Sequence, residues 1–149
     1  MNINCPFSPQ TANENVVRLT AFLVVLLMLT GLFSNLGWFA LLLSFDFFIR
    51  GFTGRPWSPL RRAAKALARL LRLKPKTINA GPKIFAARIG FVVCAIITLL
   101  AFTGLIGTAQ LLAEILVLMA GLEAFLGICV GCHIYSLFQT IKRSLRSDR

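Results

Sequence analysis

Two cysteines three positions apart are the residues whose types and spacing most directly suggest chemistry. They lie in the segment 127–133, which reads GICVGCH. Two thiols at Cys-x-x-Cys spacing can close into a disulfide, bind a soft metal or attach a haem. On a helix, Cys129 shares a face with Cys132 and His133, because residues three and four positions apart are neighbours. Four readings are open: thiol or persulfide exchange, a zinc site, covalent haem, and small residues that only pack helices together.

A third thiol, Cys5, lies in the polar segment before the first apolar run. An arm of this kind can bring Cys5 to Cys129 and Cys132, where a third thiol can resolve a mixed disulfide. We predict Cys129, Cys132 and Cys5 as the catalytic residues. His133 and Gly131 are predicted to support them, the first by tuning a thiol and the second by allowing close helix packing or a break.

Long apolar segments must position these thiols. The chain has 149 residues, of which 57% are hydrophobic and 14% are charged. Runs of about 18 or more apolar residues fit helices that span a bilayer. The sequence therefore predicts a single-domain, all-α integral membrane protein with four transmembrane helices arranged as two hairpins. The predicted spans are 16–33, 36–52, 84–105 and 110–138.

Basic residues are distributed unequally along the chain. Eleven Lys and Arg residues lie from position 50 to position 88, counting Arg50 and Arg88 at the ends of two spans, and four more follow position 141, whereas the turns at 34–35 and 106–109 contain none. The positive-inside rule places the basic side in the cytoplasm. We predict a bacterial inner-membrane protein whose arm (1–15) and tail (139–149) are both cytoplasmic. The net charge of +11 is attributed to this orientation and to anionic lipids, not to nucleic acid.

A cytoplasmic position restricts the chemistry of the thiols. A standing disulfide is not expected in a reducing compartment, and haem attachment requires the oxidising side. We predict no cofactor and no metal. If 110–138 is one helix, the cysteines lie near its C-terminal end, where the helix dipole disfavours a thiolate. A break at Gly127 or Gly131 would instead restart the helix at the cysteines.

Residues 57–73 form a basic segment with the sequence WSPLRRAAKALARLLRL. Ser58 is a good helix N-cap and Pro59 a good first helical residue. At about 100° per residue, the cations gather on one side of the helix and the leucines on the other. This pattern predicts a helix in the cytoplasmic interface that binds anionic lipids, with docking of an acidic protein as the alternative. The predicted lipid-binding residues are Arg61, Arg62, Lys65, Arg69 and Arg72.

Ionisable residues also occur in or near the predicted spans. Such groups are costly in hydrocarbon and should face the helix bundle. Asp46 and Arg50 lie four positions apart, so we expect them to pair; Glu123 is expected to pair with Arg88 or Arg50. A polar path to the thiols and a structural clasp between helices are both open readings of these four supporting residues. Cys94, in the third span, is predicted to be a small packed side chain.

Several motifs along the chain resemble those of one family. The motifs are Cys5-Pro6-x-Ser8, Asn13-Glu14-x-x-x-Arg18-Leu19-Thr20, Asp46-Phe47-x-x-Arg50, Ser58-Pro59-Leu60, Gly81-Pro82-Lys83-x-Phe85-Ala86-x-Arg88-Ile89-Gly90, Leu122-Glu123 and Cys129-x-Gly131-Cys132-x-x-Tyr135. Together they are similar to the bacterial integral-membrane family called domain of unknown function 4395, over nearly the whole chain. The resemblance implies thiol or sulfur metabolism with a thioredoxin-like or sulfurtransferase partner, because family members are found beside such proteins.

These observations predict a membrane thiol protein. Cys129 and Cys132 would exchange electrons or sulfane sulfur with a cytoplasmic thiol partner, and Cys5 would resolve or relay. Two other classes stay open. A small transporter or channel-like protein would use an intramembrane polar path and would work without its cysteines. A non-catalytic membrane anchor or assembly protein would show only apolar packing around the two glycines near the thiols.

Overall fold

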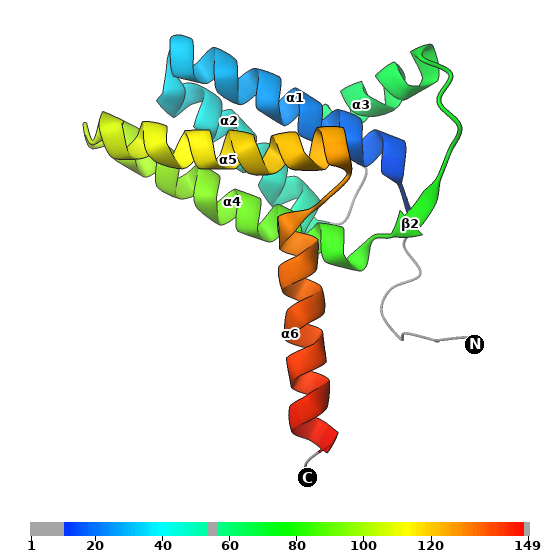
Figure 1. Cartoon of the computed structure of the whole chain (residues 1–149). Helices are drawn as coiled ribbons and strands as arrows, with labels where there is room; N and C mark the ends of the chain where they lie inside the picture. The colour runs from blue at the N-terminus through cyan, green and yellow to red at the C-terminus, as the bar shows by residue number, and fades with distance from the viewer. Residues whose placement is uncertain (1–10, 54–56, 148–149) are drawn as a thin grey trace.

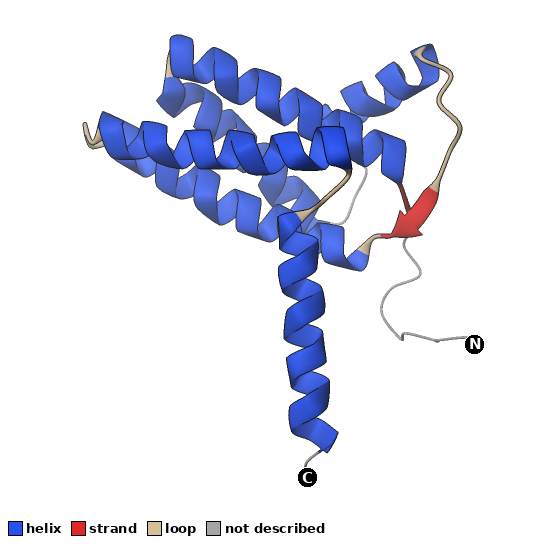
Figure 2. Cartoon of the chain, in the orientation of Figure 1, coloured by secondary structure: helices blue, strands red, loops and turns tan. Residues whose placement is uncertain are grey.

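A computed structural model describes residues 11–53 and 57–147 of the protein. Cys5, and with it the predicted third thiol, lies outside the described residues. Helices dominate the described chain, and Figure 2 shows one short pair of strands beside them. In chain order the elements are β1 (Thr11–Asn13), α1 (Glu14–Phe33), α2 (Leu36–Phe48), the π-helical turn η1 (Ile49–Thr53), α3 (Pro59–Leu70), β2 (Thr77–Asn79), α4 (Gly81–Phe102), α5 (Ile106–Leu126) and α6 (Val130–Ser147).

Four helices have the length and composition of membrane spans: α1, α2 continued by η1, α4 and α5. Figure 1 shows these four running side by side, while α6 leaves the bundle across their direction. The turns that follow α1 and α4 lie at one end of the bundle, and α3, β2 and α6 lie toward the other. The prediction of a helical protein with four such spans is confirmed.

The core between the spans is built from small and medium-sized apolar side chains. Met28, Cys94 and Ile97 are fully buried there, which confirms the packed position predicted for Cys94. Many large apolar side chains point outward instead: Leu99 is 66% exposed and Leu118 is 68% exposed. An outer surface of this kind is unfavourable in water and suits contact with lipid chains.

The predicted single helix over 110–138 is wrong. α5 ends at Leu126, Gly127 has a φ of 68°, and α6 begins at Val130. Glycine reaches this left-handed conformation without the clash that a Cβ atom would cause, and it commonly ends helices in this way. Residues 139–147, predicted as part of a tail, continue α6.

α3 begins as predicted, and its buried residues are Leu60, Ala64 and Ala68. Ser58 caps it, accepting a hydrogen bond at 3.2 Å from the backbone N–H of Arg61. Ala64 and Ala68 pack against α1, whereas Leu70 at the end of the helix is 78% exposed. Small side chains allow two helices to approach closely, so alanines rather than leucines form this contact.

A short ribbon ties the start of α1 to the segment before α4. β1 and β2 pair antiparallel, with Ala12 opposite Ile78. The backbone N–H of Glu14 donates to the carbonyl of Lys76 at 2.8 Å, and the two side chains form an ion pair at 2.9 Å. Strands of three residues carry too little alternation to be recognised from sequence, and the ribbon was not among the predicted elements.

Candidate functional site

Cys129 lies at the start of α6, directly before its first helical residue. Its carbonyl accepts hydrogen bonds from the backbone N–H groups of Cys132 and His133, each at 3.1 Å. These bonds place Cys129 at the N-cap, where free backbone N–H groups and the helix dipole favour negative charge. The break at Gly127 therefore removes the objection that the cysteines lie at an unfavourable helix end.

The sulfur of Cys129 accepts a hydrogen bond from the other cysteine of the pair. The thiol of Cys132 donates to it, and this hydrogen bond is the main reason that the pKa of Cys129 falls to about 7. Burial and the carboxylate of Glu123 oppose the fall in this pKa, whereas the backbone N–H of Cys132 and the ammonium of Lys83 add to it. The same thiol hydrogen bond raises the pKa of Cys132, which keeps its proton. Cys129 is thus the more acidic thiol of the pair.

Lys83 is the partner of Glu123, and the predicted pairing of Glu123 with an arginine is wrong. Nζ of Lys83 lies 2.6 Å from Oε1 of Glu123, and the two side chains are 21% and 20% exposed. Arg88 is engaged elsewhere, since its Nε donates to the carbonyl of Gly51 at 3.0 Å. The Lys83–Glu123 pair joins the start of α4 to the end of α5, next to Cys129.

Arg18 fixes the end of α5 from α1. Its Nε donates to the carbonyl of Ala124 at 3.2 Å, and its Nη2 donates to that of Phe125 at 2.7 Å. Carbonyls in the last turn of a helix have no partner within the helix, and a cation there also suits the dipole. The break between α5 and α6, which puts Cys129 at the start of α6, is therefore stabilised by a tertiary contact as well as by the conformation of Gly127.

Replacing Gly127 with alanine is expected to lower the free energy of unfolding by about 1–2 kcal/mol, because a Cβ atom is strained at this positive φ. Gly121, also near the end of α5, has nothing within 4 Å of its Cβ position. Gly121→Ala should raise stability by up to about 1 kcal/mol, since alanine favours helix. Thermal unfolding in detergent measures both variants, and a Gly127→Ala protein as stable as the wild type would contradict the expectation.

Gly131 lets α6 pack closely on α4. A Cβ atom at Gly131 would lie 2.9 Å from Cβ and 3.1 Å from Cα of Ala86, and the rings of Phe85 and Tyr135 pack 5.4 Å apart between the same two helices. We expect Gly131→Ala to cost about 1–3 kcal/mol of stability, because backbone atoms cannot yield as a flexible side chain does. The double variant Gly131→Ala with Ala86→Gly should recover part of the loss of thermal stability, because it removes the contact with Cβ of Ala86. Failure of this rescue would show that the contact does not set the helix spacing.

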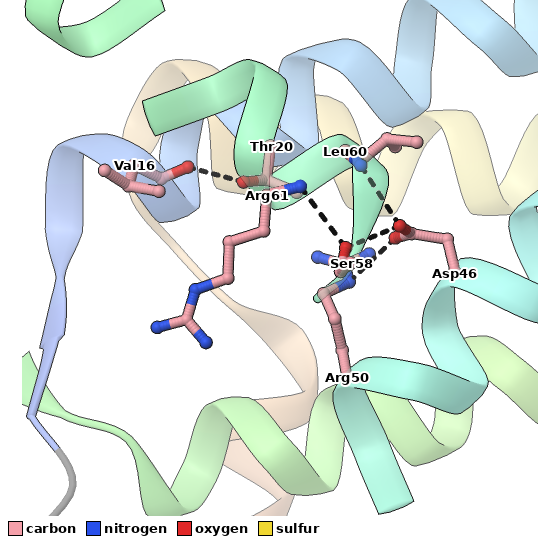
Figure 3. Close-up of polar contacts among 7 residues, drawn as sticks. All are labelled: Val16, Thr20, Asp46, Arg50, Ser58, Leu60 and Arg61. Carbon is pink, nitrogen blue, oxygen red and sulfur yellow. Dashed lines mark hydrogen bonds and ion pairs between the residues drawn. The ribbon is translucent and has the colours of Figure 1, made fainter. Parts of the chain in front are cut away.

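Asp46 is the centre of a buried polar cluster (Figure 3). Its residue exposure is 0%, and its Oδ1 accepts hydrogen bonds from Oγ of Ser58 at 2.5 Å and from the backbone N–H of Leu60 at 3.2 Å. Nε of Arg50 lies 3.0 Å from Oδ2, so the predicted Asp46–Arg50 pair is confirmed. The cluster anchors the first turn of α3 to the end of α2, and none of these contacts includes a thiol.

A cavity of about 680 Å³ borders Cys129. Its wall comes mainly from α1, α4 and α5, and Arg61 and Lys65 of α3 also line it. The other predicted lipid-binding cations are exposed: Arg62, Arg69 and Arg72.

His133 is exposed and contributes its backbone N–H to Cys129. Within 11–53 and 57–147, no three His, Cys, Asp or Glu residues form a group able to hold a metal ion.

Sequence reasoning missed Lys83, Arg18 and the cavity. Lys83 and Arg18 each lie close to one end of a predicted span, which is the signal that could have indicated contacts near the thiols.

No curated protein and no solved structure matches the chain. A family model does match, over residues 12–140, which include both cysteines of the pair. The chain therefore belongs to the family described as "Domain of unknown function (DUF4395)".

Proposed function

We propose that this protein is a membrane thiol protein in which Cys129 and Cys132 exchange electrons or sulfane sulfur with a cytoplasmic thiol partner. The observation that carries the proposal is the position of Cys129 at the start of α6, with Cys132 donating to its sulfur. A thiolate at a helix N-terminus beside a second thiol is the usual setting of a reactive cysteine. Cys129 is 7% exposed and is among the residues that line the cavity.

The exchange step uses both cysteines. The Cys129 thiolate attacks one sulfur of a partner's disulfide, the partner's S–S bond breaks, and its other sulfur leaves as a thiolate. Cys132 then loses its proton and attacks the Cys129 sulfur, which releases the partner as a dithiol and leaves a Cys129–Cys132 disulfide. The partner gains two electrons and two protons, and the pair loses them. With a persulfide donor, Cys129 attacks the outer sulfur and becomes a persulfide while the donor leaves as a thiolate.

Mass spectrometry of the full chain in lipid nanodiscs tests this proposal. The protein is incubated with an oxidised thioredoxin-like protein or with glutathione persulfide, and thiols are then trapped by alkylation. We expect Cys132→Ser to accumulate the mixed disulfide on Cys129, and Cys129→Ser to form none. Cys94→Ser is the matched control, because that thiol is buried in the core and should not affect exchange. An unchanged redox state of the wild-type pair with both donors would reject the proposal.

The partner-facing side is proposed to be the cytoplasm, with the chain in a bacterial inner membrane as two hairpins. The excess of basic residues at the end that bears α3 and α6 supports this orientation. At that end the cations of α3 are proposed to face anionic lipid head groups. α6 has an exposed apolar stripe that suits the same interface: Ile134, Leu137, Phe138, Ile141 and Leu145.

A cysteine-accessibility experiment tests the orientation. Ser34→Cys lies in the turn between α1 and α2, and Ser147→Cys lies at the end of α6. In a background without the native cysteines, a membrane-impermeant maleimide should label Ser34→Cys on intact cells and Ser147→Cys only after lysis. The reverse pattern would place the thiols on the oxidising side and would overturn the cytoplasmic assignment.

A further inference from the structure

The cavity beside Cys129 extends far into the bundle. On α5 its lining runs from Glu123 to Leu112, which at 1.5 Å per residue is about 16 Å along the helix. The wall along this path is aliphatic and includes Val24 and Leu116. The hydroxyl of Thr20, also in the wall, donates to a carbonyl of its own helix at 2.6 Å, as Figure 3 shows, so its proton is not available to a ligand. The cavity volume of about 680 Å³ lies within the range of small-molecule sites.

The end of the cavity at α3 carries an excess of positive charge. Four described lining residues are cationic: Arg50, Arg61, Lys65 and Lys83. The described lining has a single carboxylate, Glu123, and Lys83 already neutralises it. Arg61 and Lys65 form no ion pair with any described residue. In Figure 3 the guanidinium of Arg61 extends from α3 away from the Asp46 cluster. This end of the cavity therefore favours an anion.

Arg50 offers a further donor at the same end. Its Nε is 3.0 Å from Oδ2 of Asp46, and its guanidinium lies 4.5 Å from the centre of the Phe47 ring. Its Nη2 is buried and has no hydrogen-bond partner among the described residues. A buried donor left in this way is normally satisfied by water or by a ligand. Arg50 is among the residues that line the cavity, so a ligand there can supply the acceptor.

We propose that this cavity binds an anionic amphiphile, whose head group lies among Arg50, Arg61 and Lys65 and whose apolar chain runs between α1, α4 and α5. A carboxylate or phosphate head matches the charge and the guanidinium donors at that end. An aliphatic chain matches the wall, which offers no charged partner beyond Glu123 along its length on α5. The site goes beyond the proposed thiol exchange and does not depend on it.

Photo-crosslinking to the full chain in phosphatidylcholine nanodiscs tests the site. The probes are diazirine-bearing hexadecanoic acid, the matching hexadecylamine and diazirine-bearing phosphatidylglycerol. The acid should label residues of the cavity wall about tenfold more than the amine does. Ala120→Phe fills the cavity and should abolish this labelling. Gly121→Phe is the matched control, because its side chain enters open space.

Two double variants of α3 test the role of charge. Arg61→Gln with Lys65→Gln removes two cations from the cavity, and Arg62→Gln with Arg69→Gln removes two cations that do not line it. The first should lower labelling by the acid about tenfold and the second less than twofold. Equal losses in both, or equal labelling by acid and amine, would overturn the proposal.

The remaining arms identify the source of the ligand and separate the two proposals. Phosphatidylglycerol labelling that follows the same charge dependence identifies a bilayer lipid as the occupant, whereas labelling by the acid alone identifies a single-chain ligand. Absence of cavity labelling by both anionic probes overturns the site. Cys132→Ser removes the second thiol of the pair at a position that does not line the cavity, and it should bind the acid as the wild type does. A failure of thiol exchange is thereby distinguishable from a failure of ligand binding.

Discussion

Replacing Asp46 with alanine is expected to lower the free energy of unfolding by about 3–5 kcal/mol. The substitution leaves the guanidinium of Arg50 without its counter-ion inside the bundle. It also removes the acceptor for Ser58 and for the backbone N–H of Leu60, so the start of α3 loses its attachment to α2. Thermal or denaturant unfolding in a fixed detergent measures the loss.

Two controls separate the ion pair from the cap. Ser58→Ala keeps Asp46 and Arg50 paired and should cost about 1 kcal/mol, the usual value for an N-cap. The double variant Asp46→Ala with Arg50→Leu removes both charges and should recover much of the lost stability, because no unpaired buried charge remains. If Asp46→Ala costs less than the Ser58 variant, the cluster does not stabilise the fold as its geometry indicates.

Alkylation of Cys129 by iodoacetamide is expected to be at least about tenfold faster than that of Cys132 at pH 7. The pKa of Cys129 is lowered to about 7, so its thiolate is the major form above that pH and its rate should fall as the pH drops below 7. Cys132 has a raised pKa and should react slowly up to pH 9. Peptide mass spectrometry after timed quenching measures each thiol separately.

Cys132→Ala provides the control for this profile. The variant removes the thiol that donates to Cys129 and keeps the backbone N–H, so the midpoint of the Cys129 rate profile should move to higher pH. A wild-type midpoint between 8 and 9, the range of an ordinary thiol, would contradict the assigned roles. Faster alkylation of Cys132 than of Cys129 would contradict them as well.

The spans could be predicted from the sequence because hydropathy and helix length depend on local composition. The end of α5 could not, since Phe125, Leu126 and Ile128 keep the segment apolar on both sides of Gly127. A glycine within an apolar run either continues a helix or ends it. Here Arg18, more than 100 positions earlier, binds the last carbonyls of α5. That contact depends on the packing of α1 against α5 and is not encoded near the break.

The contact surface of α3 and the ion-pair partner of Glu123 also depend on tertiary packing, so neither could be predicted from the local sequence. The leucines of α3 dominate its hydrophobic pattern, but the contact with α1 is made by Ala64 and Ala68, whose small size matters more than their hydrophobicity. Glu123 could be predicted to need a cation, whereas the choice of Lys83 depends on where α4 begins relative to the end of α5. By contrast, the Asp46–Arg50 pair was predictable because both residues belong to one continuous helical segment.

The contact between Arg18 and the end of α5 has a consequence for biogenesis. The chain is made from its N-terminus, so α1 enters the bilayer before the carbonyls of Ala124 and Phe125 have been synthesised. The hydrogen bonds that Arg18 donates to the last turn of α5 can therefore form only when the first and last spans meet. The end of α5 that precedes Cys129 therefore gains this support only after the last span has been made.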